Sequence, residues 1–363
     1  MTRVGLHAGQ LLQPVPGGIG RYVRALIAHL PATGIEVVPF AAGPLRAALD
    51  CTTPTGPPCV ELGRPHGSAR YELWHRFRRP ALRVPAEVVH APSLAIPPAG
   101  RRPLVVTLRD VAFLRHPEHF TPRGRRFHER GLALARDEAA VIIVPSTFSV
   151  SEVTAAGIDQ ERIRLVPHGI DLPSAHDDAE VDRRLAPLGL PASYLLFVGT
   201  LEPRKGLPAL LAAFKSLRAR RPDLGLVVAG PAGWGGAPDL DRQGVVPLGS
   251  VSEAVLDALY RRAALLAYLS SYEGFGLPVL EAMARGCPVV ASDAGSIPEV
   301  AGDAAVLVPP GDADALEHAL ATLVDDPSAA DALRPRGLAR ARALTWGASV
   351  AAHGALYREL ATP

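Results

Sequence analysis

The stretch that decides the fold is residues 271–300, which read SYEGFGLPVLEAMARGCPVVASDAGSIPEV. A glycine-rich turn is followed by Pro278, which stands where a first-turn proline is tolerated because its missing N–H would have no helical partner. Residues 279–285 are expected to continue as helix with Gly286 as the C-cap. Residues 287–291 are then expected to form a short buried strand.

A glycine turn that feeds a helix N-terminus offers free N–H donors at the positive end of a helix dipole, which suits a phosphate. Glu273 precedes this turn, and Glu281 lies just inside the helix. Carboxylates close to a bound phosphate are useful chiefly for accepting hydrogen bonds from hydroxyl groups. The stretch therefore predicts a ligand such as a nucleotide-sugar, and the plain alternative is a β-turn-α unit with solvated glutamates.

Length and composition narrow the class of protein. The 363 residues are long for one core, so two domains are expected. A hydrophobic fraction of 48% and a formal net charge of +2 indicate a globular chain with no global case for nucleic acid binding. The three cysteines, Cys51, Cys59 and Cys287, lack metal-ligand spacing and favour a reducing compartment, although Cys51 and Cys59 could pair in principle. With neither a signal peptide nor a run of ~18 apolar residues, we expect a cytoplasmic location.

Short apolar runs alternate with helical patterns, which predicts an α/β chain with parallel strands buried on both faces. The expected strands are residues 4–8, 35–40, 88–90, 104–108, 141–144, 194–198, 224–229, 265–269, 288–291 and 305–308. The clearest helices are residues 22–30, 208–220, 252–262, capped by Ser252, and 312–323. Residues 42–65 are expected to be a surface loop. The polar residues 172–193 are interpreted as a linker between domains 1–171 and 194–344, and two such domains place a ligand in the cleft between them.

Two further loops follow predicted strands and carry phosphate-binding chemistry. Gly17 and Gly18 open a helix after the first strand and permit close backbone approach to a phosphate, with a plain turn as the alternative. Arg204 and Lys205 follow the first strand of the second domain and offer fixed cations, with a solvated basic turn as the alternative. We find no Walker A, HExxH or GxSxG motif, and we predict no metal site.

Glu273 and Glu281, separated by seven residues around GFGLPVLEAMA, resemble the signature of retaining glycosyltransferases of family 4, among them bacterial mannosyltransferases. The resemblance covers nearly the whole chain. It implies the GT-B fold, with two doubly wound Rossmann-like domains, an interdomain cleft, and a C-terminal helix in residues 345–363 that crosses back to the first domain. It also implies a metal-independent enzyme without a cofactor, whose donor is a GDP- or UDP-linked sugar.

The resemblance assigns roles to individual residues. Glu273 would bind hydroxyls of the donor sugar, while Arg204 and Lys205 would neutralise the diphosphate. The implied donor-binding positions are the amides of Phe275, Gly276 and Leu277, the ribose-binding Glu281, Gly230 and Val251 near the base, and Gly17 and Gly18 near the donor phosphates.

One position departs from the family pattern. Many relatives have His-Asp after the strand at 104–108, whereas this chain has Arg109 followed by Asp110. Arginine cannot act as a base near neutral pH, but it could bind a hydroxyl, a carboxylated sugar or an acidic acceptor. His90 could face the acceptor, or it could be a hydrogen-bonded structural histidine.

The leading hypothesis is transfer of a hexose-type sugar to an acceptor hydroxyl on a glycan, a glycolipid or a small natural product. Arg109 motivates a second hypothesis, a non-catalytic nucleotide-sugar binding protein, and a nucleotide-sugar epimerase of the same architecture is a third. Arginines cluster within residues 70–83 and 101–130. They are either solvated helix faces or a dock for anionic lipid at the inner face of the membrane or for a phosphorylated acceptor.

Overall fold

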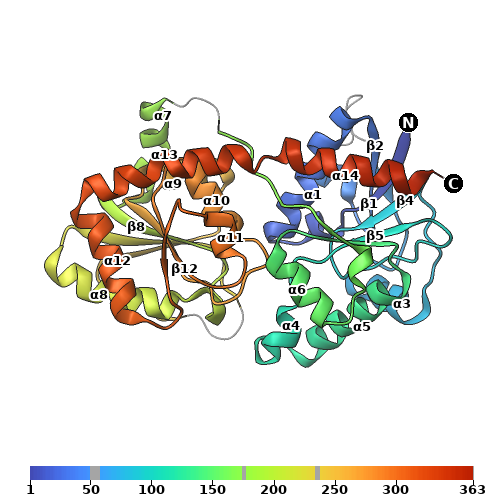
Figure 1. Ribbon diagram of the computed structural model, residues 1–363, viewed down its shortest axis with the longest axis horizontal. Helices are drawn as coiled ribbons and strands as arrows, with labels where there is room; N and C mark the ends of the chain where they lie inside the picture. Colours follow the sequence, from blue (N-terminus) through green and yellow to red (C-terminus); the bar gives the residue numbers. More distant parts are fainter. Residues whose placement is uncertain (50–57, 174–176, 234–237, 363) are drawn as a thin grey trace. The chain divides into compact units, whose positions relative to one another are not determined.

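The computed structural model describes residues 1–49, 58–173, 177–233 and 238–362, and it divides the chain into two compact units. Unit 1 consists of Met1–Gly169 with Trp346–Pro363, and unit 2 is Ile170–Thr345. Each unit has a parallel sheet with helices on both of its faces (Figure 1). Within the described ranges, no helix combines the length and the apolar character needed to cross a bilayer.

Within the described residues, unit 1 has a seven-stranded sheet of order β3-β2-β1-β4-β5-β6-β7, in which neighbouring strands are parallel. The strands are β1 (Thr2–His7), β2 (Ile35–Ala41), β3 (Val60–Glu61), β4 (Val88–Ala91), β5 (Leu104–Thr107), β6 (Val141–Val144) and β7 (Ile163–Leu165). The helices are α1 (Gly17–His29), α2 (Leu45–Leu49), α3 (Gly67–Phe77), α4 (Ala112–Arg115), α5 (Pro122–Glu138), α6 (Thr147–Ala155) and α14 (Trp346–Ala361).

The strands of unit 1 are apolar on both faces because helices cover both faces. Val89 and Ala91 of β4 belong to the same buried cluster as Trp74 of α3. Val88 belongs to the cluster on the other side, with Tyr22 of α1. Since successive side chains of a strand point to opposite faces, one continuous apolar run supplies both cores. Each fully buried valine contributes about 1.5–3 kcal/mol.

Within the described residues, unit 2 repeats this plan with a six-stranded parallel sheet of order β10-β9-β8-β11-β12-β13. The strands are β8 (Ser193–Val198), β9 (Leu224–Ala229), β10 (Val245–Gly249), β11 (Leu265–Tyr268), β12 (Val289–Ser292) and β13 (Val306–Val308). The helices are α7 (Asp178–Leu185), α8 (Leu207–Arg220), α9 (Glu253–Arg262), α10 (Leu277–Ala284), α11 (Ile297–Ala301), α12 (Ala313–Asp325) and α13 (Pro327–Ala343). Ser252 caps α9, as expected, by accepting a hydrogen bond from Val255 N.

Each sheet has one topological switch point, where the chain changes the direction in which it adds strands. It lies between β1 and β4 in unit 1 and between β8 and β11 in unit 2. In open α/β sheets the loops that leave the carboxyl ends of the strands at this point diverge and form a ligand crevice. The topology therefore marks the loops after β1 and β4, and those after β8 and β11, as candidate sites.

The segment expected to be a linker, residues 172–193, contains the helix α7. Asp177 caps this helix, and Val181 and Leu185 are buried in the core of unit 2. Charged residues surround Val181 and Leu185 in this helix, and these two apolar positions, spaced four apart, carry the helical signal.

Other elements were not among the sequence expectations. α13 contains Pro335, and β10 is a half-exposed edge strand with Pro247, so both lack a clean periodic pattern. Residues 42–65 include α2 and β3, but 50–57 lie outside the described residues. The proposed pairing of Cys51 with Cys59 therefore concerns a position that the structure does not describe.

The C-terminal helix α14 belongs to unit 1, where it lies alongside α1 (Figure 1). A buried network joins the two helices to the sheet. Tyr22 Oη lies 2.7 Å from His353 Nε2 and 2.9 Å from Thr107 Oγ1, which in turn lies 2.8 Å from His90 Nε2. The last contact of this network joins Tyr357 Oη to His90 Nδ1, 2.7 Å apart. Buried polar atoms that pair in this way fix α14 in one register.

This network and the neighbouring buried histidines predict acid sensitivity of unit 1. Burial lowers the pKa values of His7, His75 and His353 from 6.5 to about 4. The unfolded state therefore binds more protons between about pH 6.5 and pH 4. The neutral buried histidines therefore contribute fully to the free energy of unfolding above pH 6.5. This contribution is lost as the pH falls from 6.5 to 4, at about 1.4 kcal/mol per pH unit for each histidine.

Urea unfolding followed by tryptophan fluorescence measures this effect in a Trp234→Phe background, where Trp74 and Trp346 both belong to unit 1. A free energy of unfolding that stays constant between pH 6.5 and pH 4 would contradict the prediction.

Candidate active site

The carboxyl edge of the unit 2 sheet brings together two loops that are distant in sequence. The loop after β8 carries Arg204 and Lys205 on a short 3-10 turn, Pro203–Lys205. The loop after β11 carries Glu273. Because β8 and β11 are parallel neighbours at the switch point, both loops leave the sheet at the same edge.

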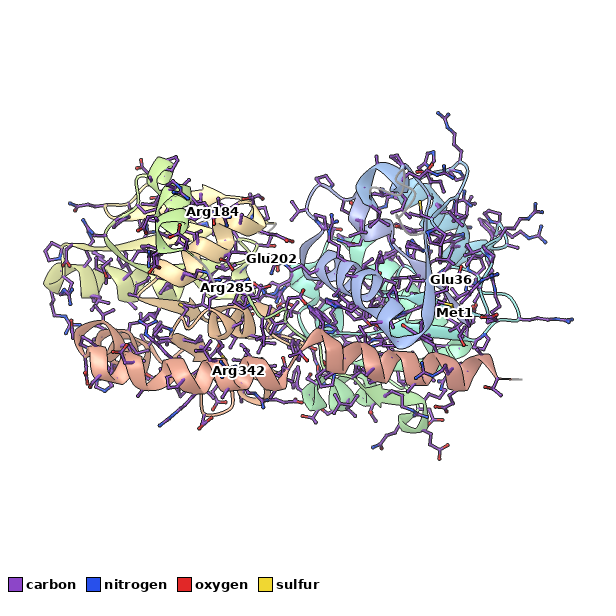
Figure 2. The ribbon with its side chains drawn as sticks, turned by 90° about the horizontal axis from the view of Figure 1, so that it is seen from above. Met1, Glu36, Arg184, Glu202, Arg285 and Arg342 are labelled. Carbon is purple, nitrogen blue, oxygen red and sulfur yellow. The ribbon has the colours of Figure 1, made fainter. Side chains whose placement is uncertain are left out.

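Glu273 is the centre of a charged cluster. Its Oε1 contacts Lys205 Nζ, and it accepts hydrogen bonds from Arg204 Nη1 at 3.0 Å and from the Tyr268 hydroxyl at 2.8 Å. Arg204 also donates from Nε to Oε2 of Glu202 at 2.9 Å, and Glu202 is labelled in Figure 2. Two carboxylates thus face two cations, so the charges of the cluster balance.

Burial and charge act in opposite directions on this cluster. Burial alone would raise the pKa of Glu273, but the charges of Lys205 and Arg204 lower it to about 2. Burial lowers the pKa of Lys205, and the charge of Glu273 opposes that change. The Glu273 carboxylate is therefore ionised at neutral pH, which excludes it as a proton donor there and makes it the counterion that favours charged Lys205.

The backbone of Glu273 is clamped by a loop that follows β12. Its carbonyl oxygen accepts hydrogen bonds from Ser296 N at 3.1 Å and from Ser296 Oγ at 2.9 Å. Gly295 has φ of 59°, and a Cβ at this position would lie 2.8 Å from the same oxygen. Position 295 therefore requires glycine, because any side chain would push the Glu273 loop away.

A second close approach fixes the turn that carries the cations. Gly206 has φ of 71°, and a Cβ there would lie 2.4 Å from the carbonyl oxygen of Leu269. In addition, Ser271 N donates to the carbonyl oxygen of Arg204 at 2.8 Å. The start of α8 therefore lies directly against the loop that follows β11, which places Arg204 and Lys205 beside Glu273.

The helix α10 begins at Leu277, so Pro278 is in its first turn as expected, and Gly276 is its left-handed N-cap. Phe275 is buried beside it. These three residues therefore form the start of the helix, as the glycine-turn pattern predicts. Glu281 is buried one turn further on, where its Oε2 accepts a hydrogen bond from Tyr260 of α9 at 3.0 Å.

The two positions expected near a nucleotide base lie at the same edge of the unit 2 sheet. Gly230 follows β9, and its N–H donates to the carbonyl oxygen of Gly249 at the end of β10 at 2.8 Å. Val251 comes two residues after β10 and is half-buried against the core below α9. The predicted donor positions of unit 2 thus follow the ends of β8, β9, β10 and β11.

Arg109 and Asp110 lie in unit 1, after β5. The Arg109 guanidinium donates from Nη2 to the carbonyl oxygen of Pro92 at 2.9 Å and lies 5.8 Å from the centre of the Tyr22 ring. Burial lowers the pKa of Arg109 to about 10, so the side chain stays charged at neutral pH. Its Nη1 is buried without a hydrogen-bond partner among the described residues. Asp110 Oδ1 accepts from Ala112 N at 3.0 Å and so holds the start of α4.

His90 and the glycine loop of unit 1 have different surroundings. His90 is fully buried, and both ring nitrogens are used, by Thr107 and by Tyr357. Such a histidine supports the packing of α14, which matches the structural alternative considered from the sequence. Gly17 and Gly18 are exposed at the start of α1, where the sequence places them.

Three residues of the cluster escaped the sequence analysis. Tyr268 ends β11 and was counted as a buried strand residue. Glu202 stands two residues before Arg204, close enough to be recognised as its partner, and Ser296 follows Gly295 in the quoted stretch. Gly295 indicates that the backbone there lies close to another segment, but the sequence does not indicate that this segment is the Glu273 loop.

One group in the described part of the chain has the residue types and spacing of a metal site. Ligand atoms of His116, Glu118 and His119 all lie within 4.8 Å of one another. The group lies directly after α4 in unit 1, with His116 at the C-cap of α4 and Glu118 and His119 on the short 3-10 turn Pro117–His119, so it does not belong to the Glu273 cluster. The Glu273 cluster has residue types suited to a phosphate flanked by hydroxyl groups, because Arg204 and Lys205 carry positive charge and the side chains of Glu273 and Tyr268 can exchange hydrogen bonds with hydroxyls.

Two family descriptions match this chain and together cover most of it. Residues 16–173 match "Glycosyltransferase Family 4", and residues 181–340 match "Glycosyl transferases group 1". The O-antigen chain mannosyltransferase B of Escherichia coli is 35% identical over 296 residues, 76% of this chain and 76% of that relative. The D-inositol 3-phosphate glycosyltransferase of Arthrobacter sp. is 30% identical over 340 residues, 79% of this chain and 77% of that relative.

Solved structures agree on the fold. Sucrose-phosphate synthase from Thermosynechococcus elongatus aligns with a TM-score of 0.76 at 23% identity, covering 99% of each chain. HepE from Anabaena, solved in complex with UDP-glucose, aligns with a TM-score of 0.74 at 22% identity, covering 99% of this chain and 100% of that one. The fold is GT-B, built from two Rossmann-like units.

The charge balance of the cluster predicts the effect of removing its central carboxylate. Glu273→Gln leaves the buried Lys205 and the half-buried Arg204 without their shared counterion, so the free energy of unfolding of unit 2 should fall by about 3 kcal/mol at pH 7. Urea unfolding of the full chain measures this change in the free energy of unfolding.

The matched control is Glu317→Gln, which breaks the exposed pair of Glu317 with Arg220 in the same unit, 3.2 Å apart. It should cost less than about 1 kcal/mol. Equal effects of the two substitutions would show that Glu273 is not the counterion of a buried cluster.

Proposed function

We propose that this chain, which belongs to glycosyltransferase family 4, moves a hexose-type sugar from a nucleoside-diphosphate sugar to an acceptor hydroxyl with retention of configuration. The observation that carries the proposal is the pair Arg204 and Lys205 at the switch point of unit 2, next to Glu273. A diphosphate leaving group gains negative charge as the glycosidic bond breaks. Two cations fixed at that point stabilise the transition state more than the ground state.

The proposed donor is linked to GDP or UDP, and the proposed transfer needs no metal ion or cofactor. Arg204 and Lys205 supply the positive charge that a metal would otherwise supply to the diphosphate. Amides at the start of α10 would bind the phosphates, and Glu281 would bind the ribose hydroxyls. A relative named as a mannosyltransferase supports a hexose as the transferred sugar.

In the proposed mechanism the acceptor oxygen attacks the anomeric carbon on the face from which the diphosphate departs. The bond from that carbon to the diphosphate oxygen breaks, the bond to the acceptor oxygen forms, and the acceptor proton passes to the departing phosphate. Glu273 has no part in this proton transfer, because its pKa of about 2 keeps it ionised. Its role is to hold the two cations and to accept hydrogen bonds from the donor sugar.

Arg109 supports keeping the two alternatives, a nucleotide-sugar binding protein without turnover and a nucleotide-sugar epimerase. It occupies the position where many relatives carry a histidine, and its buried Nη1 lacks a partner among the described residues. An arginine there would bind an anion or a hydroxyl and could not act as a base. Donor binding without turnover across a panel of acceptors would favour the first alternative, and a changed sugar without any acceptor would favour the second.

We also propose a peripheral contact of unit 1 with the anionic inner face of a membrane. The support is a group of exposed arginines, Arg76, Arg79 and Arg83, next to the exposed apolar side chain of Phe77. Basic residues near an anionic surface each contribute about 1 kcal/mol, and an exposed aromatic side chain adds burial in the interface.

Sedimentation with anionic vesicles tests this contact. The chain should pellet at low salt and be released at high salt, and Phe77→Ser should weaken the pelleting at low salt. No pelleting at low salt would end the membrane proposal.

The role of Lys205 can be tested against the second of the two lysines in the chain. Lys205→Met should lower transfer at least about 100-fold, because it removes charge that acts on the leaving diphosphate. Lys215→Met, an exposed position on α8, should leave transfer unchanged. Steady-state kinetics with UDP- and GDP-hexoses provide the measurement, and a fully active Lys205→Met enzyme would contradict the assigned role.

A further inference from the structure

Unit 1 contains a cavity of about 770 Å³ at the carboxyl edge of its sheet. Its walls come from the loops after β1 and β4, from α3 and from α5. β1 and β4 flank the topological switch point of unit 1, which is where α/β sheets bind their ligands. The volume suits a small molecule. None of the assignments made for the Glu273 cluster in unit 2 uses this cavity.

The floor of the cavity carries buried polar atoms that need partners. His7 and His75 are 2% and 7% exposed, and both line the cavity. His7 Nε2 and His75 Nδ1 have no hydrogen-bond partner among the described residues. A buried polar atom left unpaired costs about 1–3 kcal/mol, so these two atoms are positions where a water or a ligand would gain a hydrogen bond.

The protonation of His75 can be worked out from its contacts. Its Nε2 accepts a hydrogen bond from Ile96 N at 3.2 Å, so the proton of the neutral ring is on Nδ1. The ring stacks on Phe127 of α5 with centroids 4.6 Å apart, which fixes its plane. Burial and then the charge of Arg78 lower the pKa of His75 to about 4, against the charge of Glu72 and the hydrogen-bonding influence of the Leu94 backbone, which raise it. His75 therefore presents a fixed neutral N–H donor at neutral pH.

The hydroxyl of Tyr71 reaches the same place as His7. A Cβ built on Gly9 would lie 2.4 Å from Tyr71 Oη and 2.7 Å from His7 Nε2, so both polar atoms converge on this glycine. Neutral imidazoles and a phenol hydroxyl donate and accept single hydrogen bonds, which suits the hydroxyl groups of a sugar or a polyol.

The rim of the cavity has a different character. Arg123 and Arg126 on the first turns of α5 line it, and neither guanidinium forms an ion pair or hydrogen bond within the described part of the chain. Arg130 also lines it but pairs with Glu72 at 2.9 Å. The N-terminus of α5, capped by Thr121, adds the positive end of a 17-residue helix. The rim is therefore positively charged, with two arginines available to an anion.

We propose that this cavity binds a phosphorylated sugar or polyol, with its hydroxyls on His7, His75 and Tyr71 and its phosphate on Arg123 and Arg126. The statement that this ligand is the sugar acceptor rests on the proposed function, whereas the statement that the cavity binds it does not. The phosphate belongs either to a free sugar phosphate or to the headgroup of a phospholipid, and the two sources share the chemistry that the cavity recognises.

Titration calorimetry with the full chain tests the proposal, with glucose 6-phosphate and myo-inositol 1-phosphate as probes and with glucose, myo-inositol and inorganic phosphate as comparisons. The phosphorylated polyols should bind more tightly than any of the three comparison compounds. Arg123→Gln with Arg126→Gln should weaken their binding roughly tenfold or more, because each substitution removes a charge-assisted hydrogen bond.

Arg125→Gln is the matched control, because Arg125 is on the same turn of α5, does not line the cavity and lies 3.3 Å from Glu129 in an exposed pair. It should change the affinity less than about twofold. His75→Phe should weaken binding of phosphorylated and unphosphorylated polyols alike, and its thermal midpoint reports whether unit 1 still folds.

Vesicles that contain phosphatidylinositol separate the two sources of the phosphate. Binding to these vesicles, lost in Arg123→Gln with Arg126→Gln and kept in Arg125→Gln, supports the site with a lipid headgroup as the source. Failure of all phosphorylated probes at millimolar concentration, or equal loss in the Arg125→Gln control, overturns the proposal. UDP and GDP binding to the same samples reports on unit 2, so a failed donor site and a failed cavity site give different results.

Discussion

The site of unit 2 depends on one carboxylate that faces two cations. Glu273 holds Lys205 and Arg204 together across two loops, and the attraction is strong enough to lower the pKa of Glu273 to about 2 although it is buried. Without the carboxylate, two like charges would lie side by side in a desolvated position. The same arrangement has a functional consequence. Cations that are already held in place need little reorganisation when a charged leaving group forms beside them.

This cluster exists because the backbone permits two unusually close approaches. Gly206 lets the cation-bearing turn lie against Leu269, and Gly295 lets the loop after β12 lie against Glu273. Parallel strands bring these loops to one edge, and hydrogen bonds from Ser296 and Ser271 hold them there. Unit 1 uses the same topology for a different surface, with neutral polar groups on the floor of a cavity and arginines at its rim. The two units thus combine one architecture with two different sets of polar side chains at the carboxyl edge of the sheet.

The sequence predicts the sheet strands well because parallel strands that are buried on both faces are unbroken apolar runs. Their bounds are within about two residues for Val141–Val144, Leu224–Ala229 and most others. The sequence also predicts the glycine turn before α10, because glycine and proline close together mark a turn or the start of a helix. The sequence does not predict α7, whose two buried apolar residues stand among charged ones, or α13, which contains a proline.

Sequence reasoning named Glu273, Arg204 and Lys205 separately, but only the fold shows that they contact one another over 68 or 69 positions. It did not indicate the cavity of unit 1, because His7 and His75 are a strand residue and a helix residue with no shared motif. For Arg109, the residue type alone predicts a departure from the histidine of the family pattern. The structure adds that the Tyr22 ring and the carbonyl oxygen of Pro92 hold this arginine in place in unit 1.

The central claim is that the cations held by Glu273 receive the diphosphate of a nucleotide-sugar. The most direct measurement is a crystal structure of the full chain with UDP or GDP bound. The account predicts phosphate oxygens within hydrogen-bond distance of Lys205 Nζ and Arg204, at the carboxyl ends of β8 and β11. A nucleotide bound elsewhere, with both cations contacting only Glu273 and Glu202, would contradict it.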